Sequence, residues 1–133
     1  MTFIWTEISF LSLWWQSAHP TRKVNLKKLV DEGRFEILTG GWVMTDEANV
    51  DLFSMVDQLV EGHQWLLNTF NFKPKSSWSV DPFGHGSAFP YILKASGLDG
   101  KCFKLKFLWT HVRIRISRTN LIFPFFWIVM DYM

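Results

Sequence analysis

The chain has 133 residues, of which 48% are hydrophobic and 20% charged, and its formal net charge is +2. This length fits one domain or a part of one, and the composition is that of a globular rather than a disordered chain. The small net charge gives no support to a nucleic-acid partner. The single cysteine, Cys102, excludes an internal disulfide. The eight Trp and thirteen Phe residues suit a packed core, although aromatic faces also stack on sugars.

Short strands and amphipathic helices are predicted to alternate along residues 2–97. Strands are expected where β-branched and aromatic residues cluster, and helices where apolar residues recur every three or four positions. The predicted strands cover residues 2–6, 35–43 with a turn at Gly40–Gly41, and 73–81. The predicted helices cover residues 8–18, 25–33, 49–70 and the segment between Ser87 and Gly97.

Helix boundaries are marked by capping residues and by a break. The pair His19–Pro20 is expected to separate the first two helices. Asn25 is the predicted N-cap of the second helix, and Gly33 suits the position just past its end. Ser87 is the predicted cap of the last helix, and Gly97 follows its end.

The predicted helix over residues 49–70 is the longest and carries a wide apolar stripe. Gly62 lies inside it, where glycine costs about 1 kcal/mol relative to alanine. We therefore expect another segment to pack closely against Gly62, and we place His63 toward the polar side. The side predicted to face the sheet holds Leu52, Val56, Leu59 and Val60.

This alternation predicts an α/β fold, namely a partial parallel sheet with flanking helices built from βα repeats. Ligands of such sheets bind outside the carboxyl ends of the strands. Three polar junctions lie at such ends, and we expect them to meet in one crevice. The junctions are Thr6–Glu7, Gly40–Glu47 and Asp81–Ser87.

The Asp-Pro-Phe-Gly-His turn holds the strongest candidate residue, Asp81. On spacing alone, a carboxylate at a strand end is either a cap or turn residue or a ligand for a cation. His85 is similarly either a structural histidine or a ligand. Catalytic zinc sites take three protein ligands, and these two residues supply only two.

Four ordered blocks resemble glycoside hydrolase family 38, and within it the Golgi class II α-mannosidases. The resemblance covers about residues 1–99. It implies a fragment of a larger α/β, barrel-like catalytic domain. The blocks are FIWTEISFLSLWW, GRFEILTGGWVMTDEA, DQLVEGHQWL and WSVDPFGH.

The resemblance implies a zinc-dependent retaining α-mannosidase that hydrolyses terminal α-mannose during N-glycan processing in the Golgi. In that family the aspartate of the DPFGH block is both nucleophile and zinc ligand, which assigns both roles to Asp81. Other residues of the matching blocks are expected to bind substrate or to support the site. They are Trp42, Asp46, Glu47, Phe83 and His85.

No residue of this sequence matches the family's other zinc ligands, an H-x-D element and a histidine, or its acid/base aspartate. The isolated chain is therefore expected to be inactive. The family's membrane anchor is likewise not found, because the apolar stretches 1–15 and 121–130 suit neither an export signal nor a spanning helix. The sequence predicts no particular oligomeric state.

The chain divides, in this interpretation, into part of a family 38 catalytic domain at 1–99 and a divergent basic and apolar tail at 100–133. Apolar residues alternate between 103 and 116, which predicts a basic-faced hairpin. The tail is interpreted either as a contact for an anionic surface such as a membrane, or as unselected sequence from a truncated gene model. A non-catalytic carbohydrate-binding or interaction module on the same crevice is the alternative to an enzyme.

Overall fold

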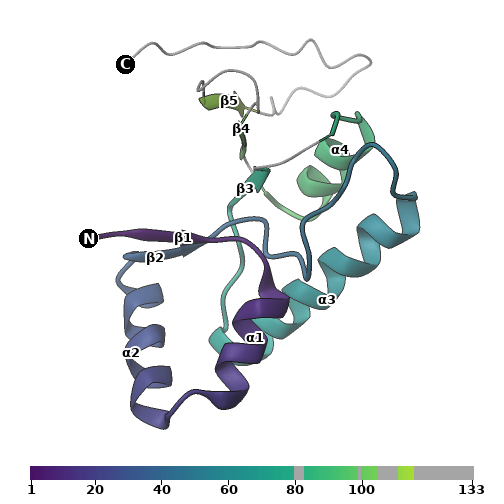
Figure 1. The fold of residues 1–133 in the computed structure, drawn as a ribbon. Coiled ribbons are helices and arrows are strands. Elements are labelled where there is room, and N and C mark those ends of the chain that lie inside the picture. Colours follow the sequence, from purple (N-terminus) through teal and green to yellow (C-terminus); the bar gives the residue numbers. More distant parts are fainter. Residues whose placement is uncertain (80–82, 99, 105–110, 116–133) are drawn as a thin grey trace.

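The structure, a computed structural model, describes residues 1–79, 83–98, 100–104 and 111–115. Apart from the consecutive helices α1 and α2, helices and strands alternate along the chain up to α4, after which two strands follow (Figure 1). The bounds are β1 (Phe3–Trp5), α1 (Ile8–Ser17), α2 (Pro20–Asp31), β2 (Phe35–Ile37), α3 (Leu52–Phe70), β3 (Ser76–Ser79), α4 (Ala88–Ala95), β4 (Gly100–Lys104) and β5 (His111–Arg115).

The described strands form two sheets, a β1–β2 pair and a three-stranded sheet in the order β3-β4-β5, and each contains one parallel pair. Strand β1 lies beside β2 with Phe3 opposite Phe35, and β3 lies beside β4 with Ser76 opposite Gly100. Helices α1, α2 and α3 lie on one side of the β1–β2 pair (Figure 1). The predicted α/β class, with parallel strands and flanking helices, is confirmed.

Within the described residues, the tail forms an antiparallel pair that overlaps the predicted hairpin at residues 103–104 and 112–115. Strands β4 and β5 pair with Gly100 opposite Arg115 and Lys104 opposite His111. Residues 105–110 and 116–133 lie outside the described residues. The predicted contact of the tail with an anionic surface therefore stays a prediction. Among the described helices, none has the length and apolar character needed to cross a membrane.

Two clusters of buried side chains form the core, and helix α3 contributes to both of them. The first, here called the sheet-side cluster, joins β2 with α1, α2 and the second half of α3. The second, here called the α4 cluster, joins the first half of α3 with α4. The sheet-side cluster consists of Ile8, Leu11, Leu26, Val30, Ile37 and Leu66. The α4 cluster consists of Met55, Leu59, Phe89, Ile92, Leu93 and Leu98.

Helix α2 begins earlier than the sequence predicted. Pro20 is its first residue and His19 is its N-cap, with the Thr21 amide donating to the His19 Nδ1 atom at 3.4 Å. Asn25 therefore lies inside the helix, and its assignment as the cap is wrong. Proline favours the first helical position because its φ is already helical. Its lack of an N–H costs nothing there, since an N–H at that position has no partner within the helix. Gly33 follows the helix end with φ +67°, as predicted.

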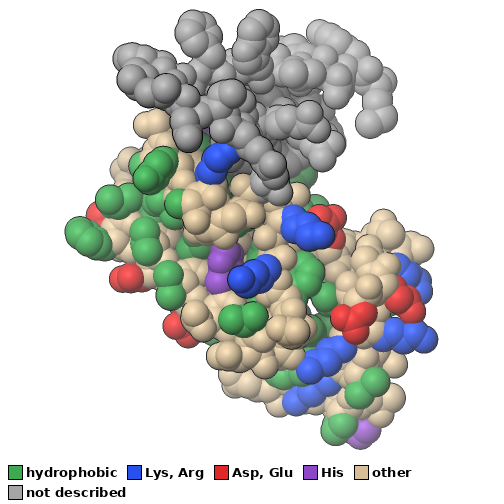
Figure 2. Space-filling model, turned by 180° about the vertical axis from the view of Figure 1, so that it is seen from behind, with side chains coloured by type: hydrophobic (Ala, Val, Ile, Leu, Met, Phe, Trp, Pro, Cys, Tyr) green, Lys and Arg blue, Asp and Glu red, His purple; other side chains and the backbone are tan. Residues whose placement is uncertain are grey.

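Helix α3 begins after Asp51, whose carboxylate accepts hydrogen bonds from the Ser54 amide at 3.0 Å and the Ser54 hydroxyl at 2.7 Å. Its buried side was predicted only in part, since Leu59 is 2% exposed but its predicted companions are exposed. Figure 2 shows apolar side chains at the surface over α3, on the left of the view. The helix buries Met55, Leu59, Gly62 and Leu66 and exposes Leu52, Val56 and Val60.

Candidate active site

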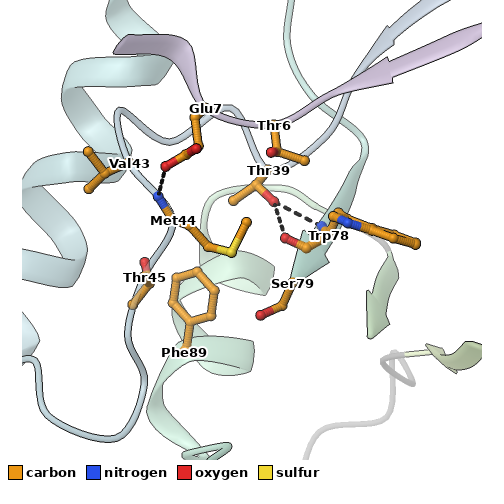
Figure 3. A pocket seen from close by; sticks show the side chains of 9 residues that line it. All are labelled: Thr6, Glu7, Thr39, Val43, Met44, Thr45, Trp78, Ser79 and Phe89. Atoms are coloured by element: carbon orange, nitrogen blue, oxygen red, sulfur yellow. Dashed lines mark hydrogen bonds between the residues drawn. The ribbon is translucent and has the colours of Figure 1, made fainter. Parts of the chain in front are cut away.

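A small pocket lies at the carboxyl ends of β1, β2 and β3 (Figure 3). Thr6 and Glu7 follow β1, Thr39 follows β2, and Ser79 ends β3, so segments far apart in sequence meet there. Among the described residues its cavity volume is about 10 Å³, which suits roughly one water molecule. The predicted convergence of the first two junctions is confirmed. The lining residues are Thr6, Glu7, Thr39, Val43, Met44, Thr45, Trp78, Ser79 and Phe89.

Thr39 ties the end of β2 to β3. Its amide donates to the Ser76 carbonyl at 2.7 Å, and its Oγ1 accepts from the Trp78 amide at 2.9 Å. The same Oγ1 lies 3.2 Å from the Trp78 carbonyl oxygen (Figure 3). It also lies 2.9 Å from the Ser77 Oγ. Thr39 has φ +58°, which is strained for a β-branched residue. Such strain persists only where the surrounding contacts fix it.

Helix α3 supports this junction from behind. The His63 Nε2 donates to the Thr39 carbonyl at 2.8 Å. A Cβ placed on Gly62 would collide with the Gly40 carbonyl and would lie 2.7 Å from the Trp42 nitrogen. The predicted close packing at Gly62 is confirmed, and its partner is the loop after β2. The placement of His63 toward the polar side is wrong, because its ring contacts the Thr39 carbonyl in the loop after β2.

Glu7 and the start of α1 hold the next part of the same loop. The Glu7 Oε1 accepts from the Met44 amide at 3.1 Å (Figure 3). The Ile8 and Ser9 amides, which have no partner inside helix α1, donate to the Gly41 and Trp42 carbonyls, both at 3.0 Å. A helix N-terminus needs such external acceptors. The loop thereby completes the helix while being fixed by it.

Trp42 and Asp46 both contact neighbouring groups in the described residues, and their predicted part in substrate binding stays a prediction. The Trp42 ring is partly buried against the sheet-side cluster, and it is not among the residues that line the pocket. The Asp46 Oδ1 accepts from the Ala48 amide at 3.1 Å, and Asn49 Nδ2 donates to its Oδ2 at 3.4 Å. Asp46 thus forms the local turn typical of aspartate in loops.

Glu47 and His85 are brought together, although 47 and 85 lie far apart in sequence. The Glu47 side chain is 0% exposed, and its Oε2 accepts from the Gly86 amide at 3.2 Å. Its Oε1 lies 3.5 Å from the His85 Nδ1, which makes an ion pair when the imidazole is protonated. A carboxylate buried this deeply requires donors. The loop that leads into α4 supplies them.

The sequence also assigned roles to Asp81 and Phe83. Asp81 lies outside the described residues, together with Val80 and Pro82, so its predicted place in the crevice is not tested. Phe83, on the other side of this gap, is 73% exposed. It is not among the residues that line the pocket.

The roles of Thr39 and of the supporting His63 escaped the sequence analysis. The positive φ of Thr39 has no signature in its residue type, because threonine rarely adopts it. A partial signal was available in the Gly40–Gly41 turn that follows Thr39 and in the Gly62–His63 pair. Both glycine sites indicate that another segment packs close to the backbone, but neither shows which segment it is.

The described residues do not form a metal site by themselves. No group of three or more His, Cys, Asp or Glu side chains within them is arranged to hold a metal ion. The zinc implied by the resemblance therefore does not fit these residues alone. Any such site requires ligands from outside the described part of the chain.

Parallel βα units whose polar residues meet at the carboxyl ends of the strands are the arrangement of α/β enzymes. The sequence matches the family described as Glycosyl hydrolases family 38 N-terminal domain over residues 1–131. The chain belongs to this family.

Proteins named Alpha-mannosidase 2 are similar to this chain in several organisms. The identity is 56% over 100 residues in Spodoptera frugiperda, 51% over 96 residues in Homo sapiens and 46% over 97 residues in Arabidopsis thaliana. These alignments cover 75%, 72% and 73% of this chain. The same alignments cover 9%, 8% and 8% of the respective relatives, so the chain spans less than a tenth of their length.

Proposed function

We propose that this chain is part of a retaining α-mannosidase that removes terminal α-mannose from N-glycans in the Golgi. Family membership and the similarity to proteins named Alpha-mannosidase 2 support this proposal. The observation that carries it is the pocket at the strand ends. Ser79, the last residue of β3, lines that pocket and is followed closely by Asp81 in the sequence.

In the proposed reaction Asp81 is the nucleophile. Its carboxylate forms a bond to the anomeric carbon while the glycosidic C–O bond breaks, and a separate carboxylic acid protonates the leaving oxygen. Water then hydrolyses the mannosyl ester and regenerates both groups. The acid/base carboxylate has no match in this sequence and is assigned to the remainder of the catalytic domain. Asp81 is also proposed as a zinc ligand, with the other ligands outside the described residues.

A chimeric enzyme tests this role. Residues 1–98 of this chain replace the matching segment of the Spodoptera frugiperda relative, to which the chain is 56% identical. We expect turnover of an aryl α-mannoside, and a mannosyl adduct on the peptide that contains Asp81 after rapid quenching. Asp81→Asn should lower kcat by a factor on the order of 10³ or more, as loss of a nucleophile does.

The matched control is Asp57→Asn, because Asp57 is an exposed carboxylate on α3. This variant should retain full turnover. An adduct that persists in Asp81→Asn would assign the nucleophile to another residue. Binding of mannoside without turnover in the unsubstituted chimera would favour the non-catalytic carbohydrate-binding alternative.

The 133-residue chain alone is expected to be silent in the same assay with added zinc. Protonation of the leaving oxygen is worth about 10²–10⁴ in rate, and no residue of this chain matches the family's acid/base aspartate. The chain and its Asp81→Asn variant should therefore give equal, background rates, and zinc should not be retained through gel filtration. Turnover that disappears in the variant would contradict this expectation.

A further inference from the structure

One loop holds the connection between β3 and α4 on both sides of residues 80–82. This loop joins β2 to α3 and contributes Thr39 at its start and Glu47 near its end. Thr39 contacts Trp78, which precedes residues 80–82, and Glu47 contacts Gly86, which follows them. Both contacts come from the loop between β2 and α3, so this one loop holds both flanks of the β3–α4 connection.

The Thr39 hydroxyl contacts the backbone of Trp78 in addition to the Ser77 hydroxyl. Its Oγ1 reaches both peptide groups of Trp78, accepting from the amide at 2.9 Å and lying 3.2 Å from the carbonyl oxygen. The position of Thr39 is fixed in turn by the His63 ring on its carbonyl, at 2.8 Å. Through Thr39, the end of β3 is therefore held in place by helix α3 as well as by β2.

The anchor at Glu47 works through burial. Its side chain is 0% exposed, and two groups of the β3–α4 connection face it. The Gly86 amide donates to its Oε2 at 3.2 Å, and the His85 Nδ1 lies 3.5 Å from its Oε1. Removal of a carboxylate from water is costly unless hydrogen bonds replace the lost hydration. The buried charge therefore favours the arrangement in which the loop after residues 80–82 stays against residue 47.

We propose that Thr39 and Glu47 are positioning residues of the proposed reaction, because they hold the described flanks of the β3–α4 connection. The inference rests on the proposed function, in which Asp81 is the nucleophile. Catalytic groups must be held within about 0.5 Å of the productive geometry by supporting contacts. Two anchors that flank a short connection provide that restraint.

The test uses the chimeric enzyme and separates the hydroxyl of Thr39 from its shape. Thr39→Val keeps the β-branched shape at φ +58° and removes the Oγ1 contacts, whereas Thr39→Ser keeps the hydroxyl. We expect Thr39→Val to lower kcat by about 10- to 100-fold with KM changed by less than about 3-fold, as misplacement of a catalytic group does. Thr39→Ser should return kcat to within about 3-fold of the parent.

Glu47 is tested in the same enzyme with a graded pair. Glu47→Ala removes every acceptor and should lower kcat by about 100-fold, whereas Glu47→Gln retains an oxygen for the Gly86 amide and should lower it by about 10-fold. The control Glu61→Gln changes an exposed carboxylate on α3 and should leave kcat unchanged. Hydrogen exchange of the Gly86 amide should accelerate in Glu47→Ala and stay slow in Glu61→Gln.

The outcomes distinguish the two proposals. An unchanged kcat in Thr39→Val and Glu47→Ala, with Asp81→Asn inactive, would overturn the positioning role while leaving the nucleophile in place. A kcat that falls equally in Thr39→Val and Thr39→Ser would also overturn it, since the hydroxyl would then not matter. Full activity of Asp81→Asn would overturn the proposed function itself.

Discussion

The sheet-side cluster and the α4 cluster share helix α3, but they are built from different kinds of contact. The sheet-side cluster is bordered by partly buried aromatic residues, and the Trp15 and Phe70 rings lie 4.9 Å apart between centroids. Lys27 adds its ammonium group 5.7 Å from the Trp15 ring. The α4 cluster packs helix against helix, with Val50 as its partly buried neighbour.

The candidate pocket lies where these two clusters meet. Thr39 and Met44 come from the loop that follows β2, which supplies the sheet-side cluster, and Phe89 belongs to the α4 cluster. Between the clusters, the loops are held by hydrogen bonds to Thr39, Glu7 and Glu47 rather than by apolar packing. Polar contacts are directional, so this boundary suits a site that must hold groups in fixed places.

The largest effect is expected for Leu66→Ala, which removes a fully buried side chain from the sheet-side cluster. The free energy of unfolding should fall by about 2–5 kcal/mol, because the cavity left behind adds to the lost transfer free energy. Leu67→Ala is the matched control, since the neighbouring Leu67 is 39% exposed. Denaturant unfolding gives both values.

The same variant asks whether the two clusters unfold together. Helix α3 belongs to both, so in Leu66→Ala the amides of α4 should lose protection against hydrogen exchange along with those of α1. Unchanged protection in α4 would show instead that the α4 cluster is an independent unit.

An intermediate effect is expected for Gly62→Ala, at the contact between α3 and the loop after β2. Alanine would gain about 1 kcal/mol at an open helix position, but here its Cβ meets backbone atoms of residues 40–42. We therefore expect a net loss of about 1–3 kcal/mol, as in other overpacked sites. The free energy of unfolding, measured with denaturant, checks this expectation. A variant more stable than the parent would refute the close contact. Glu61→Ala, at an exposed neighbouring position, is the control.

The smallest effect is expected at the start of α3, outside both clusters. Hydrogen bonds from the Ser54 hydroxyl and amide lower the pKa of Asp51 below its ordinary value of 3.8. The ionised carboxylate is thus favoured in the folded state, so its contribution is present above the unfolded pKa and is lost as pH falls through the folded pKa. Wild type should be more stable than Asp51→Asn at pH 7.

Thermal unfolding of both proteins from pH 7 down to about pH 2 measures this difference. The two unfolding temperatures should converge as the solution becomes acidic. A difference that stays constant over that range would assign the contribution of Asp51 to something other than its charge.

Local sequence signals determined most of the secondary structure and the family. Helix α1 was predicted because Ile8, Leu11 and Trp15 recur on one side, and the first two are buried as expected. Gly62 correctly indicated a close contact, since an interior glycine is costly without one. Four ordered blocks identified the family, which the match over residues 1–131 confirms. All these signals lie within a few turns of helix or a single strand.

Tertiary structure decided everything that depends on residues distant in sequence. The apolar stripe of α3 is wider than its buried side. Packing against the two clusters and the contact of Gly62 with the loop after β2 together bury Met55 and Leu66 and leave Val56 and Val60 exposed. Likewise, nothing in the sequence near Glu47 shows that its donors come from Gly86 and His85.

The strained backbone of Thr39 has the same origin. Threonine has no intrinsic preference for φ +58°, and the conformation exists because contacts with Ser76, Trp78 and His63 together fix it. Periodicity and composition report the preferences of neighbouring residues along the chain. The pairing of polar groups across the fold is set by which segments pack together, and that is settled only when the whole chain is folded.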